Sequence, residues 1–233
     1  YLPTIIPPVP WKEMEGGGYY NERLNPIRFI KTGGKNLSAG DLDETMNAVN
    51  VIQSTAWSIN KPIFEVFKGF QETGGGIKKM ASSTPPDLVP KPWPENISES
   101  AFKRWKGKNP KSMADYNKKA SKAHRERSKW VSHRLIQDQQ VLMGNMYQDE
   151  EAFWYPANVD YRGRVYSLAG NGAINPQGTD IAKGLLRFSK GKPLGEEGAE
   201  WLAIHIANCF GEDKLSLAAR SEWTDENTDM ILD

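Results

Sequence analysis

The sequence has one cysteine and three histidines, so it can form neither an internal disulfide bond nor a cysteine-rich metal site. The single cysteine, Cys209, lies in an apolar helical pattern that predicts a buried, unreactive thiol and indicates intracellular chemistry. No run of 18 apolar residues occurs, so no transmembrane helix is predicted. A basic and then apolar leader is also lacking, and the chain begins at Tyr1 without a methionine, which indicates a fragment boundary.

Acidic side chains are scarce in one segment, although the 233-residue chain as a whole has a charge of only +1. Residues 103–134 contain twelve Lys or Arg but only two acidic residues, Asp115 and Glu126, which gives this segment a charge of +10. The rest of the chain therefore carries −9. A basic block in an otherwise acidic protein predicts a surface for a polyanion, and a solvated charged helix is the alternative.

The basic block lies within the longest helical pattern of the sequence. Asn109 and Pro110 are typical of a helix start, and the pattern continues to about Tyr147, which predicts a helix roughly 55 Å long. Its packing ridge is predicted to contain Tyr116, Ala120, Ala123, Trp130, Val131 and Leu142. The opposite ridge carries Lys118, Lys122, Arg125 and Lys129. Because these cations largely lack the i,i+4 acidic partners of a solvated face, the pattern favours contact with phosphates.

A second candidate site is the stretch of residues 158–166, NVDYRGRVY. If the stretch is extended, alternate side chains share one face, namely Asp160, Arg162, Arg164 and Tyr166. Two guanidinium groups, a carboxylate that can orient one of them and an aromatic ring suit the phosphates and sugars of a nucleic acid. Gly163 would let a backbone approach closely. The alternative is a surface strand with an ordinary Asp–Arg ion pair.

The remaining segments predict shorter elements. Asp41 and Glu44 form a plausible capping box for a helix that runs to about Phe67 and that Pro62 is expected to kink or locally break near Asn60. Residues 73–96, rich in glycine and proline, predict a loop. Strands are predicted at residues 153–155 and 163–168.

Two helices are predicted after these strands. The first is capped by Thr179 or Asp180, runs through Phe188 and carries Lys183 in its first turn. The second spans residues 196–210, with Trp201 and Leu202 among its inward side chains, and ends at Gly211. The whole pattern predicts a mainly α protein with small β elements, an α+β class.

Ordered motifs occur along most of the chain. In the second half they are FWYPAN (153–158), DYRGRVY (160–166), NPQGTD (175–180), KGLL (183–186), GKPLG (191–195) and WLxIHxxN (201–208). Upstream are PW (10–11), GGGY (16–19) and QxTAWxIN (53–60). Together they resemble the single-subunit, bacteriophage-type DNA-directed RNA polymerases, the family of the T-odd coliphage and mitochondrial enzymes. The resemblance is weakest between about residues 70 and 115.

The resemblance implies a middle segment of a right-hand polymerase. Residues 1–72 would be the C-terminal part of its N-terminal domain, residues 73–148 a thumb with the long basic helix, and residues 149–233 the start of the palm. The resemblance also implies contact with template or RNA–DNA hybrid at the 158–166 stretch, the basic ridge and Lys183. Lys214 would lie near the incoming nucleotide, although without the resemblance it is a loop ion pair with Asp213.

The implied reaction is nucleotidyl transfer with Mg²⁺, DNA template, RNA transcript and nucleoside triphosphates. In the family the metal is held by palm aspartates, which would lie outside this chain together with the fingers, so the isolated chain is expected to be inactive. A phage protein of this kind would act in the host cytoplasm. Two alternatives stay open: a stand-alone, non-catalytic nucleic-acid-binding module, and one subunit of a split polymerase.

Overall fold

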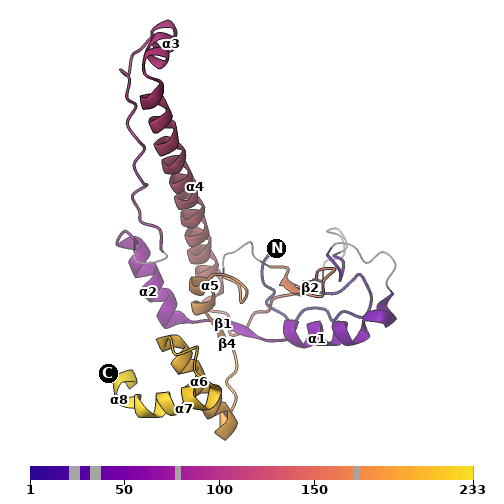
Figure 1. Ribbon diagram of the computed structural model, residues 1–233. Helices are drawn as coiled ribbons and strands as arrows, with labels where there is room; N and C mark the ends of the chain where they lie inside the picture. The colour runs from indigo at the N-terminus through magenta and orange to yellow at the C-terminus, as the bar shows by residue number, and fades with distance from the viewer. Residues whose placement is uncertain (21–26, 32–37, 77–79, 170–173, 233) are drawn as a thin grey trace. The chain divides into compact units, whose positions relative to one another are not determined.

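The computed structural model describes residues 1–233 except 21–26, 32–37, 77–79, 170–173 and 233. The chain divides into two compact units, residues 1–189 and residues 190–233. Helices are the main elements of both units, and the first unit also contains two small antiparallel strand pairs (Figure 1). The mainly α class with small β elements is therefore confirmed. The predicted three-part division at residues 72 and 148 stays a prediction. Among the described residues, no helix is both long and apolar enough to cross a membrane.

The N-terminal core is built around the indole of Trp11. Its Nε1 donates a hydrogen bond of 2.7 Å to the carbonyl oxygen of Ala157. Asn50, on α1 (Asp43–Gln53), accepts from the Trp11 N–H at 2.7 Å and donates to the Trp11 carbonyl at 2.9 Å. Gly17 lies directly against the indole, so any side chain at that position would collide with the ring. These contacts attach the proline-rich N-terminal segment to α1 and to the strand that begins at Ala157.

The helix predicted from Asp41 to about Phe67 is interrupted near Asn60, as one alternative of the prediction had it, but the interruption is longer than a local break. A capping box of Ser38 and Asp41 opens the short 3-10 helix η1 (Ala39–Leu42), and α1 follows it. Strand β1 (Trp57–Ile59) then separates α1 from α2 (Lys61–Glu72). Pro62 occupies the first turn of α2, where its missing N–H is not needed, so it starts a helix instead of kinking one.

Strand pairing also shortens the helix predicted after Thr179. The Thr179 hydroxyl accepts from the Ala182 N–H at 3.3 Å and caps α5 (Asp180–Gly184), as predicted, but the next residues form β4 (Leu186–Phe188). β4 pairs antiparallel with β1, and the rings of Trp57 and Phe188 lie 4.7 Å apart. Pairing with β1, a strand far upstream in the sequence, is thus what prevents the helix from continuing.

Helix α4 (Pro110–Tyr147) confirms the predicted long helix and its start, and follows α3 (Glu99–Lys108). Its packing ridge differs from the prediction, because Val131 is 43% exposed and Leu142 is 60% exposed. The buried positions are Ala123, Gln137, Gln140, Met143, Gly144 and Tyr147. The ring of Phe64, from α2, packs directly on Gly144, and this contact determines which side of α4 faces the core.

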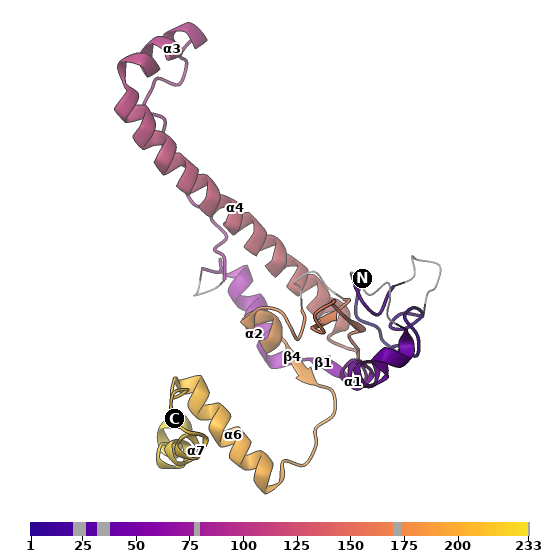
Figure 2. The ribbon, with the colours of Figure 1, turned by 45° about the vertical axis from the view of Figure 1, so that its right-hand side comes forward.

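The segment between α2 and α3 has no helix or strand over most of its described residues, as predicted for residues 73–96, and it packs along α4 (Figures 1 and 2). Trp130 Nε1 donates to the Ser82 carbonyl at 2.8 Å. Farther along, the ring of Trp93 lies 4.8 Å from that of Tyr116 and 4.9 Å from that of Phe102. The loop therefore supports the long helix through side-chain contacts.

The second unit consists of α6 (Gly195–Phe210), α7 (Leu217–Glu226) and α8 (Thr228–Leu232). Gly211 ends α6 with φ +101°, as predicted. Ile204 and Ala207 are buried, whereas Trp201 and Leu202, predicted to point inward, are 60% and 47% exposed. Cys209 is exposed as well, so the predicted buried thiol is wrong. The helix buries only the stripe that faces α7, and these three side chains lie on other sides of it.

Candidate nucleic-acid interface

The stretch 158–166 is not extended throughout but forms a β-hairpin, and the strand predicted at residues 163–168 is confirmed by β3. β2 (Ala157–Val159) pairs antiparallel with β3 (Val165–Ser167). Between them, the Asp160 N–H donates to the Arg164 carbonyl at 2.9 Å and the Gly163 N–H donates to the Asp160 carbonyl at 3.0 Å. Gly163 has φ +78°. Aspartate at the first turn position and a left-handed glycine at the fourth are typical of three-residue hairpin loops, so the sequence carries a local signal for this turn.

The Asp160 carboxylate holds the turn together with both of its oxygens. Oδ1 accepts from the backbone N–H groups of Arg162 and Arg164, at 2.9 and 3.0 Å. Oδ2 accepts from Arg162 Nε and Nη2, at 3.1 and 3.0 Å, and from the Tyr166 hydroxyl at 3.3 Å. One oxygen therefore shapes the backbone, and the other orients a guanidinium and a phenol. The side chains of Asp160, Arg162 and Tyr166 meet here, as the sequence led us to expect, although by a turn.

The same contacts keep Asp160 ionised. Burial alone would raise the pKa of this carboxyl, but the backbone N–H groups of Arg164 and Arg162 and the Arg162 guanidinium outweigh burial, so the pKa is lowered. The hydrogen bond to Asp160 and its charge in turn raise the pKa of Arg162. The pair is therefore charged at neutral pH and keeps the guanidinium in one orientation.

The outer side of the hairpin carries exposed binding groups. Tyr161 is 68% exposed, and the Arg162 guanidinium carbon lies 5.4 Å from the centre of its ring. Arg164 is exposed, and its guanidinium has no hydrogen bond or ion pair with the described residues. The Tyr161 ring can stack on a base, and the two guanidinium groups can bind phosphates. A Cβ at Gly163 would meet nothing within 4 Å, so its backbone angle, not a close neighbour, accounts for this glycine.

The basic ridge of α4, which we call the cationic stripe, consists of Lys118, Lys122, Arg125 and Lys129, all exposed. Its cations are poorly neutralised: Lys122 lies 3.9 Å from Glu126, and Arg125 Nε donates to the Ser121 carbonyl at 3.3 Å. Lys119, outside the stripe, forms a closer ion pair of 2.8 Å with Asp115. The four positions are spaced i, i+4, i+7 and i+11, so their charges form one row along the helix.

The two remaining candidates, Lys183 and Lys214, belong neither to the hairpin nor to α4. Lys183 is exposed in the last turn of the short helix α5, not in a first turn. Lys214 lies in the second unit, just after α6, and its Nζ is 3.3 Å from Asp213 Oδ2. This contact is an exposed ion pair between adjacent residues, which contributes little to stability. A nucleotide contact for Lys214 stays a prediction.

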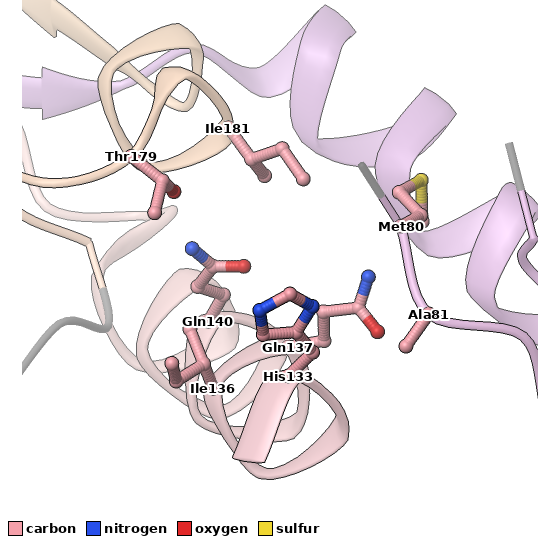
Figure 3. Close-up of a pocket in the computed structure, with 8 residues that line it drawn as sticks. All are labelled: Met80, Ala81, His133, Ile136, Gln137, Gln140, Thr179 and Ile181. Atoms are coloured by element: carbon pink, nitrogen blue, oxygen red, sulfur yellow. The ribbon is translucent and has the colours of Figure 1, made fainter. Parts of the chain in front are cut away.

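Sequence reasoning missed a cavity of about 320 Å³ between the lower half of α4, the Met80–Ala81 segment and α5 (Figure 3). Its polar lining includes His133 and Gln137. The sequence signal for this cavity is a pair of glutamines, Gln137 and Gln140, which lie on the same side of α4 as Gly144 and Tyr147. The signal can be recognised only when it is known which side of α4 is buried.

No cluster of three or more His, Cys, Asp or Glu side chains suited to a metal ion occurs among the described residues. The part of the chain that the structure describes therefore does not fit the divalent metal of nucleotidyl transfer.

Comparison with known proteins places these features in a family. A family model described as DNA-dependent RNA polymerase matches residues 192–233. The chain is 35% identical to the DNA-directed RNA polymerase of Enterobacteria phage T3 and 32% identical to T7 RNA polymerase of Escherichia phage T7. Each alignment covers the whole chain and 25% of the relative. The mitochondrial DNA-directed RNA polymerase of Neurospora crassa is 34% identical, over the whole chain and 16% of the relative.

The chain thus spans about a quarter of the length of its phage relatives. The resemblance inferred from the motifs is confirmed, and it extends through the basic helix as well, since each alignment includes every part of the chain. By these matches, the chain is similar over its whole length to a segment of the DNA-directed RNA polymerases of phages and mitochondria.

Proposed function

We propose that this segment holds the template and the RNA–DNA hybrid of a DNA-directed RNA polymerase during transcription. The observation that carries the proposal is the cationic stripe, an exposed and poorly neutralised row of charge on α4. Such a row binds the phosphate backbone without reading sequence, as a transcribing enzyme requires. In this proposal α3, α4 and their loop act as the thumb, and residues 149–233 begin the palm.

The proposed role of the stripe predicts a change in salt dependence. Replacing Lys118, Lys122, Arg125 and Lys129 together by glutamine removes up to four phosphate contacts. The slope of log Kd against log salt should then decrease by roughly 3 to 4 units, at about 0.7 to 0.9 per contact. The measurement is titration of a single-stranded oligonucleotide and of an RNA–DNA hybrid at several salt concentrations.

A charge-matched control separates contact from net charge. Lys61, Lys68, Lys103 and Lys119 each form an ion pair with an acidic side chain, at 2.8 to 3.4 Å. Replacing these four by glutamine lowers the net charge equally and should leave the slope nearly unchanged. Equal slopes in the two quadruple variants would show that the stripe is only a solvated face.

The hairpin is proposed as a second contact with the same nucleic acid. Arg162 would hold a phosphate in a fixed position because Asp160 orients its guanidinium, and Arg164 would supply a second charge. Tyr166 and Gly163 would maintain the hairpin, and Lys183 would add a phosphate contact. Lys214 would contact the incoming nucleoside triphosphate.

The complete polymerase would use Mg²⁺ held by carboxylates other than those described here, and it would work with fingers and the rest of the palm in the host cytoplasm. The purified 233-residue chain is therefore expected to incorporate no labelled nucleotide above a no-protein control, with Mg²⁺ and template present. RNA synthesis by the chain alone would contradict this prediction. Activity only after mixing with a polypeptide that carries the metal-binding palm would favour a split polymerase over a non-catalytic binding module.

A further inference from the structure

The cavity beside α4 combines apolar walls with a few polar groups. Its walls include Met80, Ala81, Ile136 and Ile181, and its polar lining includes His133, Gln137 and Thr179. Figure 3 shows the side chains of His133, Gln137 and Gln140 on one side of the cavity and those of Ile181 and Met80 on the other. A volume of about 320 Å³ lies at the lower end of the range for small-molecule sites.

Gln137 is the unusual residue of this cavity. Its side chain is buried, with the residue 3% exposed, yet neither Nε2 nor Oε1 has a hydrogen-bond partner among the residues that the structure describes. A buried amide without partners is costly, so native proteins rarely keep one unless water or a ligand satisfies it. Both amide atoms are buried at the edge of the cavity, so the side chain must rotate to offer its donor and its acceptor to a ligand there.

The cavity continues the cationic stripe along α4. At 100° per residue, His133, Ile136 and Gln140 follow Lys129 on the same side of the helix as Lys118, and Gln137 lies at the border of that side. Lys129 and Gln137 are eight residues apart, about 12 Å along the axis. This distance matches about three to four nucleotide steps of a stacked strand at 3.4 Å each. A strand held on the stripe thus reaches the cavity within a few nucleotides.

We propose that the cavity receives one unpaired nucleobase of a strand held on the cationic stripe, an inference that rests on the proposed function. The amide of Gln137 pairs with the Watson–Crick edge of the base, and the apolar side chains cover its faces. Each base presents a donor or an acceptor along that edge, and the glutamine amide can rotate to match it, so the site is tolerant of sequence. It selects an unpaired base, because pairing occupies that edge.

The lining argues against other ligands of similar size. Among the described residues that line it there is no lysine, arginine, aspartate or glutamate, so these residues offer no fixed charge to a free phosphate or a metal ion. An aliphatic ligand would leave the Gln137 amide without partners. A flat, polar-edged and uncharged group fits both the walls and the amide.

The test measures the effect of a single base on affinity. One probe is a strand of about twelve deoxyribose phosphates without bases, and the other carries one base at its centre. The single base can slide into the cavity, so it should tighten binding to the chain about tenfold. In Gln137→Met, which keeps a similar side-chain volume, the gain should fall to less than about threefold, while the salt slope stays unchanged.

Two controls isolate the cavity. Gln139→Met changes an exposed glutamine of the same helix and should keep the tenfold gain. Tyr161→Ala removes the exposed ring of the hairpin, which is the other candidate acceptor of a base, and shows whether the gain arises there instead. Loss of the gain in Tyr161→Ala but not in Gln137→Met would overturn the proposal.

A melting curve separates a ligand site from a structural role. Gln137→Met removes a buried amide without partners, so the variant should melt at a higher temperature than the parent. A lower melting temperature together with an unchanged gain would mean that Gln137 serves packing, with water in the cavity. If free adenosine or uridine binds to the chain while the single base gives the strand no gain in affinity, the cavity takes free nucleosides, and the proposal of a strand as the source of the base is overturned.

The outcomes also distinguish this proposal from the proposed function. If the stripe variant loses its salt slope but Gln137→Met keeps the gain, the stripe stands and the cavity proposal fails. If Gln137→Met loses the gain while the stripe variant keeps the parent's slope of log Kd against log salt, the cavity binds a base but the stripe does not hold the strand.

Discussion

Gly144→Ala is expected to destabilise the unit of residues 1–189 by about 2 kcal/mol, although alanine favours helix. The Cβ of alanine would collide with the ring of Phe64, which is fully buried. Overpacking of this kind costs about 3 kcal/mol, because the rigid ring and its neighbours must shift. Higher helix propensity offsets about 1 kcal/mol of that cost. The measurement is urea unfolding of the chain, followed by circular dichroism.

Two comparisons test the explanation. A Cβ added at Gly107, in α3, would meet no atom within 4 Å, so Gly107→Ala should stabilise by about 0.5 to 1 kcal/mol. Phe64→Leu should restore part of the loss when combined with Gly144→Ala, since the smaller side chain leaves room for the methyl group. Equal effects of the two glycine substitutions would show that the Phe64 contact does not determine the position of α4.

Asp160→Ala is expected to abolish the order of the hairpin turn, whereas Asp160→Asn should keep most of it. Asparagine retains an oxygen that can accept from the N–H groups of Arg162 and Arg164, as Oδ1 does, but it loses the acceptor for the guanidinium. Alanine loses both sets of bonds. Amide exchange at Arg162 and Arg164 should therefore become fast in the alanine variant and stay slow in the asparagine variant.

Binding should separate the two roles of this carboxylate. If a fixed guanidinium positions a phosphate, both variants should bind a single-stranded oligonucleotide about tenfold more weakly, because both release the Arg162 side chain. If only the turn matters, the asparagine variant should bind as the parent does. Unchanged binding in both variants would mean that the Asp160–Arg162 contact is a structural ion pair.

The pH dependence of the turn has a definite sign. Hydrogen bonds outweigh burial and lower the pKa of Asp160 from its ordinary value of 3.8. The stabilisation by the carboxylate is therefore fully present above pH 3.8 and is lost as the pH falls through the lower, folded value. The amide chemical shifts of Arg162 and Arg164 should stay constant from about pH 7 to near pH 4 and change only below it.

Local patterns in the sequence determined much of this protein. The start of α4 at Pro110, the Thr179 cap and the Gly211 stop depend on residues within one or two turns of each site. The charge of residues 103–134 and the family motifs are equally local. The pairing of Asp160 with a neighbouring arginine also followed from the order of residues, although the turn that forms it was missed.

Only the tertiary structure decided the features that depend on distant partners. β4 forms because β1 is available to pair with it, and Phe64 from α2 fixes the buried side of α4. That side places Gln137 in a cavity, whereas helical periodicity alone had pointed to Leu142. Sequence periodicity gives the repeat of a helix but not its phase, because the phase depends on which neighbour covers it. Charge and caps are properties of a segment, whereas burial is a property of what packs against it.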